Sequence, residues 1–277
     1  MSVLTLASDP GDATALETAE AHHARLAGEL AGRVTMLLTA VDRDSIAAER
    51  IHAGLVAFCD RSLLPHAAAE EAALYPAAHG MPEARLLVEG LIGEHRCLTA
   101  LVDALRAAPD AAEAAADARA LHVLFEEHLA KENGLVLPLL AMTPEVCLAD
   151  LLADMHHDLA NGSSTEGSPG DRDDEEGHAG DGGRAEAAGG CGGACGCGGA
   201  EEADEPELDV RDVPHALRHA TVFGALDAVP AGTAMVLIAP HDPLPLLARI
   251  EQRAPGVFSV EYLERGPETW RLRLRHR

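Results

Sequence analysis

Apolar residues recur every three or four positions through the first half of the chain, the spacing that gathers them on one face of an α-helix. The pattern predicts four long helices at about 13–41, 45–78, 82–107 and 111–141, and a shorter one at about 144–159. Pro65 interrupts the second stripe, so we expect a kink just before His66. Long amphipathic helices joined by short breaks indicate an all-α, up-and-down four-helix bundle.

The pattern of hydrophobic positions changes twice after residue 160. Residues 161–206 are rich in Gly, Ser, Asp and Glu and lack a hydrophobic period, which is typical of a flexible linker. From residue 207, short strand-like stretches occur at 208–211, 234–238, 258–263 and 270–274, with helical spacing at about 214–228 and 243–253. We therefore predict a helical domain at 1–160, an acidic linker with Gly and Cys at 161–206, and a small α/β two-layer sandwich at 207–277.

The composition narrows the classes of partner. A net charge of −25 argues against nucleic acid and anionic membranes, because both repel an acidic protein. There is no run of about 18 apolar residues, so a membrane span is not expected. The N-terminus has neither the basic start nor the apolar core of a signal peptide. We expect a cytoplasmic protein.

Histidine lies on the core-facing stripe of each of the four long predicted helices. These residues are His23, His66, His95 and His128. A single histidine on an apolar face is more often a core residue with one hydrogen bond, but four in one bundle favour a shared site. Glu70 and Glu132 follow one turn after His66 and His128 on the same faces. A buried carboxylate without a partner costs several kcal/mol, so a metal or tight pairing must compensate it. Together the four histidines and two glutamates favour a two-metal site. Imidazole and carboxylate without thiolate suit iron or manganese.

Residues 15–158 resemble the hemerythrin-like (HHE cation-binding) domains, which are four-helix bundles around a non-haem di-iron centre. The resemblance rests on His22-His23, Pro65-His66-Ala67-Ala68-Ala69-Glu70-Glu71, Leu74-Tyr75-Pro76, Glu94-His95 and His128-Leu129-Ala130-Lys131-Glu132. It implies two non-haem iron ions, with four histidines as terminal ligands and two glutamates as bridges. These implied ligands are His23, His66, His95, His128, Glu70 and Glu132. His22 is the alternative to His23, which continues the helical stripe better.

The chain differs from the oxygen-carrying members of that family in two places. Those members have a second histidine one turn after the helix-three histidine, where this chain has Thr99, and they end with His-x-x-x-x-Asp instead of His-x-x-x-Glu. The pattern is more similar to bacterial di-iron proteins implicated in repair of iron centres after nitrosative or oxidative stress. Thr99 is expected to leave one iron position open to O2, NO, peroxide or solvent.

The resemblance therefore implies a di-iron protein that binds or senses O2 or NO in a stress response. An enzyme that decomposes peroxide or NO, and an iron-storage bundle without turnover, would use the same ligands, so both stay open. Glu71, Glu94 and Glu127 are expected to be mostly solvated, because adjacent residues on a helix point about 100° apart. Tyr75 is expected to pack in the core.

Three cysteines lie close together in a glycine tract of the predicted linker: Cys191, Cys195 and Cys197. Thiolates on such a backbone can capture a soft metal or exchange disulfides. Three are one short of the usual four-ligand zinc or iron–sulfur set, so a passive linker is favoured.

The segment 207–277 resembles an uncharacterised domain family often fused to hemerythrin-like domains and similar to small Tus/SirA-like sulfur carriers. The matching text is Leu208-Asp209-Val210-Arg211, Arg218-His219, His241-Asp242-Pro243-Leu244-Pro245-Leu246 and Trp270-Arg271. Sulfur carriers place Cys-Pro-x-Pro at the first strand-to-helix turn, where this chain has Asp212-Val213-Pro214-His215, so persulfide transfer by that route is doubtful. Arg218, His219, His241 and Asp242 fall near junctions where small α/β domains bind ligands or partners; alternatively, Asp242 caps a helix.

Overall fold

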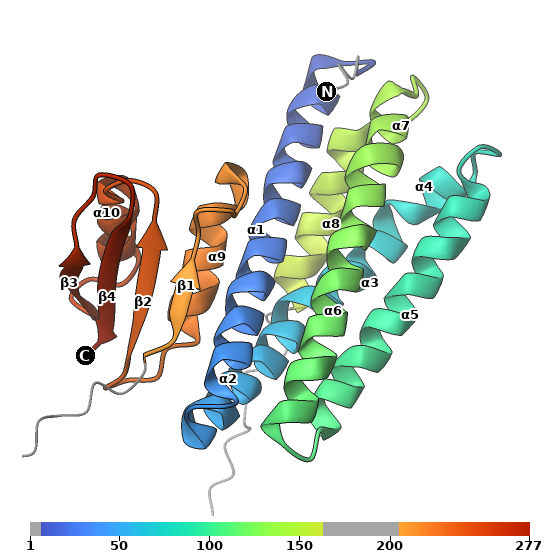
Figure 1. Ribbon diagram of the computed structural model, residues 1–277. Coiled ribbons are helices and arrows are strands. Elements are labelled where there is room, and N and C mark those ends of the chain that lie inside the picture. Colours follow the sequence, from blue (N-terminus) through green and yellow to red (C-terminus); the bar gives the residue numbers. More distant parts are fainter. Residues whose placement is uncertain (1–6, 163–204) are drawn as a thin grey trace, which may run out of the picture.

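A computed structural model describes residues 7–162 and 205–277 of the 277-residue chain (Figure 1). Most of the predicted linker, including Cys191, Cys195 and Cys197, lies outside the described residues, so what was expected of it stays a prediction. Among the described helices, none combines the length and the hydrophobicity needed to cross a bilayer.

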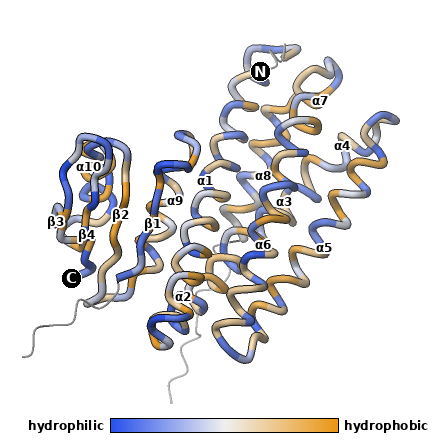
Figure 2. Tube along the Cα trace, viewed as in Figure 1, coloured by the Kyte–Doolittle hydropathy of each residue, from blue (hydrophilic) through white to orange (hydrophobic). Residues whose placement is uncertain are grey.

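The N-terminal region is mostly helical, and its long helices pack side by side as a bundle (Figure 1). Its helices are α1 (Pro10–Ala40), α2 (Ser45–Phe58), α3 (Leu64–Ala73), α4 (Tyr75–His79), α5 (Arg85–Ala107), α6 (Ala111–Lys131), α7 (Leu137–Met142) and α8 (Leu148–Gly162). The helical stretches predicted from hydrophobic spacing are confirmed apart from their ends and their internal breaks. Figure 2 shows the reason: hydrophobic and hydrophilic segments alternate along each helix.

Aspartate caps begin three of these helices. The Asp44 carboxylate accepts from the N–H groups of Ile46 and Ala47 at the start of α2. At the start of α6, the Asp110 carboxylate accepts from the N–H groups of Ala112 and Glu113. Asp9 precedes α1 and accepts from the N–H of Gly11. Each cap satisfies backbone donors that would otherwise lack a helical partner, which stabilises a helix by about 1 kcal/mol.

Two π-helical turns, η1 (Cys59–Leu63) and η2 (Glu132–Val136), lead into α3 and α7. In η1 the N–H of Leu64 bonds the carbonyl five residues back, directly before Pro65. The arrangement repeats in η2 before Pro138. A proline has no N–H and would clash with the carbonyl four residues back in a regular α-helix. The wider π turn relieves that clash, so the structure has a π turn where the sequence predicts a kink.

A small sheet with helices forms the C-terminal region. Its elements are β1 (Glu207–Asp209), α9 (His215–Asp227), β2 (Ala234–Ala239), α10 (Leu244–Arg253), β3 (Phe258–Glu264) and β4 (Trp270–His276). The strand order is β1-β2-β4-β3, with β1 parallel to β2 and the other neighbours antiparallel. Every residue of β2 is buried, in keeping with its continuous hydrophobic colour in Figure 2. Apolar side chains of β1, β2 and β4 share one buried cluster with those of α9 and α10.

Helix α9 lies between the sheet and α1, and the two helices meet through glycines (Figure 1). A Cβ atom on Gly32 would lie 2.1 Å from the carbonyl oxygen of Thr221, and one on Gly224 would lie 2.3 Å from the carbonyl oxygen of Glu29. A Cβ on Gly28 would meet the Cβ of Ala220 at 2.4 Å. Only glycine permits so close an approach of two backbones, so this crossing fixes the C-terminal region against the bundle.

Candidate metal centre

Two apolar clusters divide the core of the bundle along its length. On α1, Leu16 belongs to one cluster and Leu26 to the other, and His23 falls between them. On α5, His95 lies between Leu91 and Leu98, which again belong to different clusters. The gap between the clusters is therefore filled by polar side chains.

The structure brings together in this gap all six residues that the sequence predicts as ligands. They are His23 on α1, His66 and Glu70 on α3, His95 on α5, His128 on α6 and Glu132 at the start of η2. None of them exposes more than 4% of its surface. Helical spacing alone places His66 with Glu70, and His128 with Glu132, on the same face of a helix. The packing of the helices then brings these faces together with His23 and His95.

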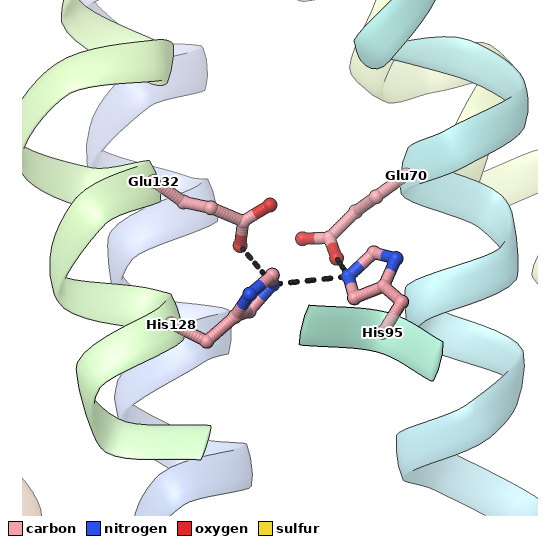
Figure 3. Close-up of side chains that lie close together, drawn as sticks. All are labelled: Glu70, His95, His128 and Glu132. Carbon is pink, nitrogen blue, oxygen red and sulfur yellow. Dashed lines mark hydrogen bonds and ion pairs between the residues drawn. The ribbon is translucent and has the colours of Figure 1, made fainter. Parts of the chain in front are cut away.

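Glu70 lies in the middle of the six. Its Oε1 is 3.0 Å from His66 Nε2 and 3.2 Å from His23 Nε2, whereas its Oε2 is 3.6 Å from His95 Nε2. Two groups of potential ligand atoms result: His23, His66 and Glu70; and Glu70, His95, His128 and Glu132. Figure 3 shows the second group, in which the Nε2 atoms of His95 and His128 are 3.0 Å apart. Glu70 is shared by the two groups, while Glu132 belongs to one.

Several buried polar atoms of the centre have no hydrogen-bond partner among the described residues. They are both nitrogens of His66, both oxygens of Glu70 and the Oε2 of Glu132. The short distances around Glu70 therefore lack the alignment of hydrogen bonds, although the atoms of each group lie within 4.8 Å of one another. Orphaned buried carboxylate oxygens are costly. A cation between them would satisfy them, and the donor set fits a metal that binds imidazole and carboxylate.

The electrostatics of the metal-free centre couple the carboxylate to its imidazoles. Burial opposes ionisation of Glu70, but the surrounding histidines outweigh it and hold the pKa of this carboxyl well below its usual range. Burial alone would lower the pKa of His23 and His95, yet the nearby Glu70 carboxylate outweighs it and raises both. These shifts favour protonated imidazoles beside an ionised Glu70 in the metal-free centre.

Three of the four histidines are oriented through Nδ1. His23 Nδ1 lies 2.7 Å from the side-chain oxygen of Asn133, and His95 Nδ1 lies 2.8 Å from a Glu71 oxygen. His128 Nδ1 lies 3.1 Å from a Glu94 oxygen, and Lys131 donates to the other Glu94 oxygen. An acceptor at Nδ1 leaves the Nε2 lone pair facing the centre, which is the usual arrangement of histidine ligands.

These acceptors were missed in the sequence. Most of Glu71, Glu94 and Glu127 were expected to be solvated, and Glu71 and Glu127 are exposed, but Glu71 also contacts His95 and the partly buried Glu94 contacts His128. Tyr75 was expected to pack in the core. Tyr75 is buried, and its hydroxyl donates to Glu132 at 2.7 Å. The available signal was a polar residue beside three of the ligands, Glu71 after Glu70, Glu94 before His95 and Asn133 after Glu132. Such a residue points away from its own helix's ligand and toward the ligand of the neighbouring helix.

Two other expectations have different outcomes. Thr99 is exposed and donates to the His95 carbonyl of its own helix, so its side chain is not part of the centre, and the open iron position expected there stays a prediction. His22 lies outside both ligand groups: its Nδ1 is 3.2 Å from an Arg25 nitrogen, and its ring packs 5.0 Å from that of His66. Of the two neighbouring histidines, His23 is the one that the fold places in the centre.

Two of the four polar residues singled out in the C-terminal region, Arg218 and Asp242, make local contacts, and the expected binding role of the four stays a prediction. Arg218 donates to the carbonyl oxygens of Val213 and Arg211, which holds the turn before α9. The expected helix cap at Asp242 is wrong, because α10 has no side-chain cap and Asp242 accepts instead from the Tyr262 hydroxyl at 2.8 Å.

Comparison with known families agrees with this geometry. Residues 14–140 match the Hemerythrin HHE cation binding domain family, and residues 207–276 match the family described as Uncharacterized conserved protein (DUF2249). No significant match was found among curated proteins or among solved structures. The family match and the buried His/Glu cluster together indicate a metal-binding protein.

Proposed function

We propose that this chain is a non-haem di-iron protein that binds or senses O2 or NO in the response to oxidative or nitrosative stress, or in the repair of iron centres. The single observation that carries the two-metal assignment is the position of Glu70, whose two oxygens face different histidines. One metal position is held by His23, His66 and Glu70, and the other by Glu70, His95, His128 and Glu132.

The choice of iron rests on donor chemistry and on the family match. Imidazole and carboxylate ligands without thiolate suit iron, with manganese as the alternative. When bound, a pair of iron ions supplies redox chemistry and sites for small ligands. The protein contributes a buried pocket, oriented imidazoles and, in this proposal, the up-and-down four-helix topology typical of such centres.

The first experiment counts metal. The chain is purified without oxygen, loaded with Fe2+ and analysed for iron; we expect two irons per chain. The double variant His66→Ala with Glu70→Ala should lose both. The matched control is His79→Ala with Glu89→Ala, which removes an exposed His–Glu pair 3.4 Å apart elsewhere in the bundle and should keep both irons. Equal iron content in the two variants would end the metal proposal.

A second experiment separates the uses of such a centre. The loaded protein is mixed with O2, NO or peroxide while its absorption spectrum is recorded. A stable spectral change with NO or O2 supports binding or sensing. Rapid consumption of peroxide or NO would favour an enzyme, and release of iron without a spectral response would favour storage.

The C-terminal region has a role of its own in this proposal, as a partner-binding module similar to the small sulfur carriers. Its β-α-β-α-β-β order and its mixed sheet support that similarity. The first strand-to-helix turn holds Asp212, Val213 and Pro214 where the carriers have cysteine, so the similarity does not extend to persulfide transfer. Pull-down with the full chain and with a chain lacking 207–277 tests for such a partner.

A further inference from the structure

Two of the four histidines of the centre have a carboxylate at Nδ1. His95 Nδ1 lies 2.8 Å from Glu71 Oε1. His128 Nδ1 lies 3.1 Å from Glu94 Oε2, and Lys131 donates to the other oxygen of Glu94 and offsets part of its charge. Both imidazoles belong to the ligand group shown in Figure 3. This half of the centre is therefore supported by negative charge from outside.

The other two histidines have no carboxylate at Nδ1 within the described residues. His23 Nδ1 lies 2.7 Å from the side-chain oxygen of Asn133, which is a neutral amide. His66 is buried, and its Nδ1 lacks a hydrogen-bond partner in the part of the chain that the structure describes. The ring of His22 lies beside it, with centroids 5.0 Å apart. His23 and His66 form the other ligand group with Glu70, so the outer partners divide the centre into two unlike halves.

The amino-acid sequence explains where these outer partners come from. Each is the chain neighbour of a ligand, and it points about 100° away from that ligand toward the histidine of another helix. The four neighbours are Glu71 beside Glu70, Glu94 beside His95, Asn133 beside Glu132 and His22 beside His23. Two of them are carboxylates, one is an amide and one is an imidazole, so the asymmetry is a property of this chain's own residues.

The partner at Nδ1 affects how strongly an imidazole binds a metal through Nε2. A carboxylate acceptor fixes the ring and raises its basicity as a ligand. A hydrogen bond to a charged acceptor is roughly twice as strong as one to a neutral acceptor. The direct ligands do not supply such a difference, because each half has two histidines and the family resemblance implies that both glutamates bridge.

We propose that Glu71 and Glu94 make the position of His95 and His128 the tighter of the two metal positions, so that the position of His23 and His66 fills second and empties first. This inference rests on the two-metal function proposed above. Glu71, Glu94 and Asn133 are positioning residues, because they contact the histidines and not the metal. They set the order in which the centre fills.

The test is stepwise metal binding by the full chain without oxygen, followed with Fe2+ and with Mn2+. For the unchanged protein we expect a tighter and a weaker step. Glu71→Gln keeps an oxygen that can accept from His95 Nδ1 but removes the charge. We expect it to weaken the tighter step by about 10-fold, the lower end of the usual effect of changing a group that orients a ligand, and to spare the weaker step.

Asn133→Asp makes the opposite change in the other half. It keeps the shape of the side chain and places a carboxylate at His23 Nδ1, so we expect it to strengthen the weaker step by about 10-fold. A general loss of structure cannot strengthen binding, so this variant keeps the test valid if Glu71→Gln folds poorly. The matched control is Glu89→Gln, which removes a 56% exposed carboxylate of α5 outside the centre and should change neither step.

Repulsion between two cations also separates the two steps, even when the halves are identical. The first metal would then choose the unaltered half, so Glu71→Gln would weaken the weaker step and Asn133→Asp would strengthen the tighter one. That pattern would overturn the inference. Equal weakening of both steps by Glu71→Gln, or no change in either variant, would overturn it as well, while the two-metal function would stand. If the unchanged protein binds no metal, the proposed function itself fails, which is a distinct outcome.

Discussion

Helix α1 has two faces that are built on opposite principles. One face carries His23 into the metal centre, where buried nitrogen and oxygen atoms lie close together and several lack hydrogen-bond partners within the described residues. The other face carries Gly28 and Gly32 into the crossing with α9, where backbone meets backbone and the fit leaves no room for one methyl group. In the proposed function a metal ion satisfies the unpartnered atoms of the centre. The crossing of α1 and α9, in contrast, is already closely packed without any ligand.

This difference predicts different responses to change. The centre should tolerate small alterations of shape, because a cation and its ligands can adjust, but it should respond to charge, protons and metal. The stability of the crossing should not depend on charge or on metal, but the addition of a single carbon atom should disrupt its packing. Each of the following experiments asks whether the two faces of α1 behave in this separate way.

The largest effect is expected at the crossing. In Gly32→Ala the new Cβ would lie 2.1 Å from the Thr221 carbonyl oxygen and 2.5 Å from the Ala225 nitrogen, and neither backbone atom can move cheaply. We expect a loss of at least about 3 kcal/mol in the free energy of unfolding, measured with denaturant, and easier proteolytic separation of the C-terminal region. Gly90→Ala is the control, since a Cβ there has nothing within 4 Å and should stabilise α5 by about 0.5–1 kcal/mol. Equal behaviour of the two variants would contradict the close crossing.

Metal should stabilise the bundle by a comparable but smaller amount. At a concentration about a hundred times its dissociation constant, Fe2+ or Mn2+ is expected to add about 2.7 kcal/mol to the free energy of unfolding, because it binds only the folded centre. The double variant His66→Ala with Glu70→Ala should show no such gain. Thermal or denaturant unfolding with and without metal measures the difference. An undiminished gain in the double variant would place the metal elsewhere.

The pH dependence of metal binding follows from the raised pKa of His23 and His95. In the metal-free protein, protonation of these residues adds stability below their ordinary pKa of 6.5, and that stability is lost as the pH rises through their raised values. Metal must displace the same protons, so its affinity should rise with pH until the pH exceeds these raised pKa values, by up to about tenfold per unit for each proton released. Metal titrations at several pH values, together with a measurement of proton release, check this; an affinity independent of pH would contradict it.

The smallest effect is expected at the rim of the crossing. Arg33 donates to Asp227 at 2.8 Å, and its guanidinium lies 4.4 Å from the centre of the Phe58 ring. Asp227 is one-third exposed and also pairs with Arg253, so solvent and a second partner reduce what Arg33 contributes. Arg33→Met should cost no more than about 1 kcal/mol in denaturant unfolding and leave metal binding unchanged. A loss as large as that of Gly32→Ala would show that charge, not close fit, holds the crossing.

Much of the molecule could be predicted from local patterns. Helical and strand periods located the elements, because side chains three, four or two positions apart share a face whatever the rest of the chain does. The same rule placed His66 with Glu70 and His128 with Glu132, since each pair lies one turn apart on one helix. The histidine stripes then predicted that six side chains would meet, and they do.

Other features depend on how the helices are rotated against one another, and no spacing along one helix contains that information. Glu71 and Glu94 each orient a histidine on a different helix, and Tyr75 reaches Glu132 across the bundle. The two glutamates also differ, because Glu70 belongs to both ligand groups and Glu132 to one, although their motifs match in sequence. Thr99 shows the converse, since a position that the family resemblance makes suggestive is exposed here.

The spacing of apolar and ligating side chains is a property of each helix or strand by itself. The amino-acid sequence alone therefore predicted the helices, the strands and the six residues that meet in the centre. Helix packing decided which carboxylate is shared, which groups orient the histidines, and that α9 rests on Gly28 and Gly32. The physical reason is that packing joins residues far apart in the chain, and their distance and alignment arise only when the helices settle against one another.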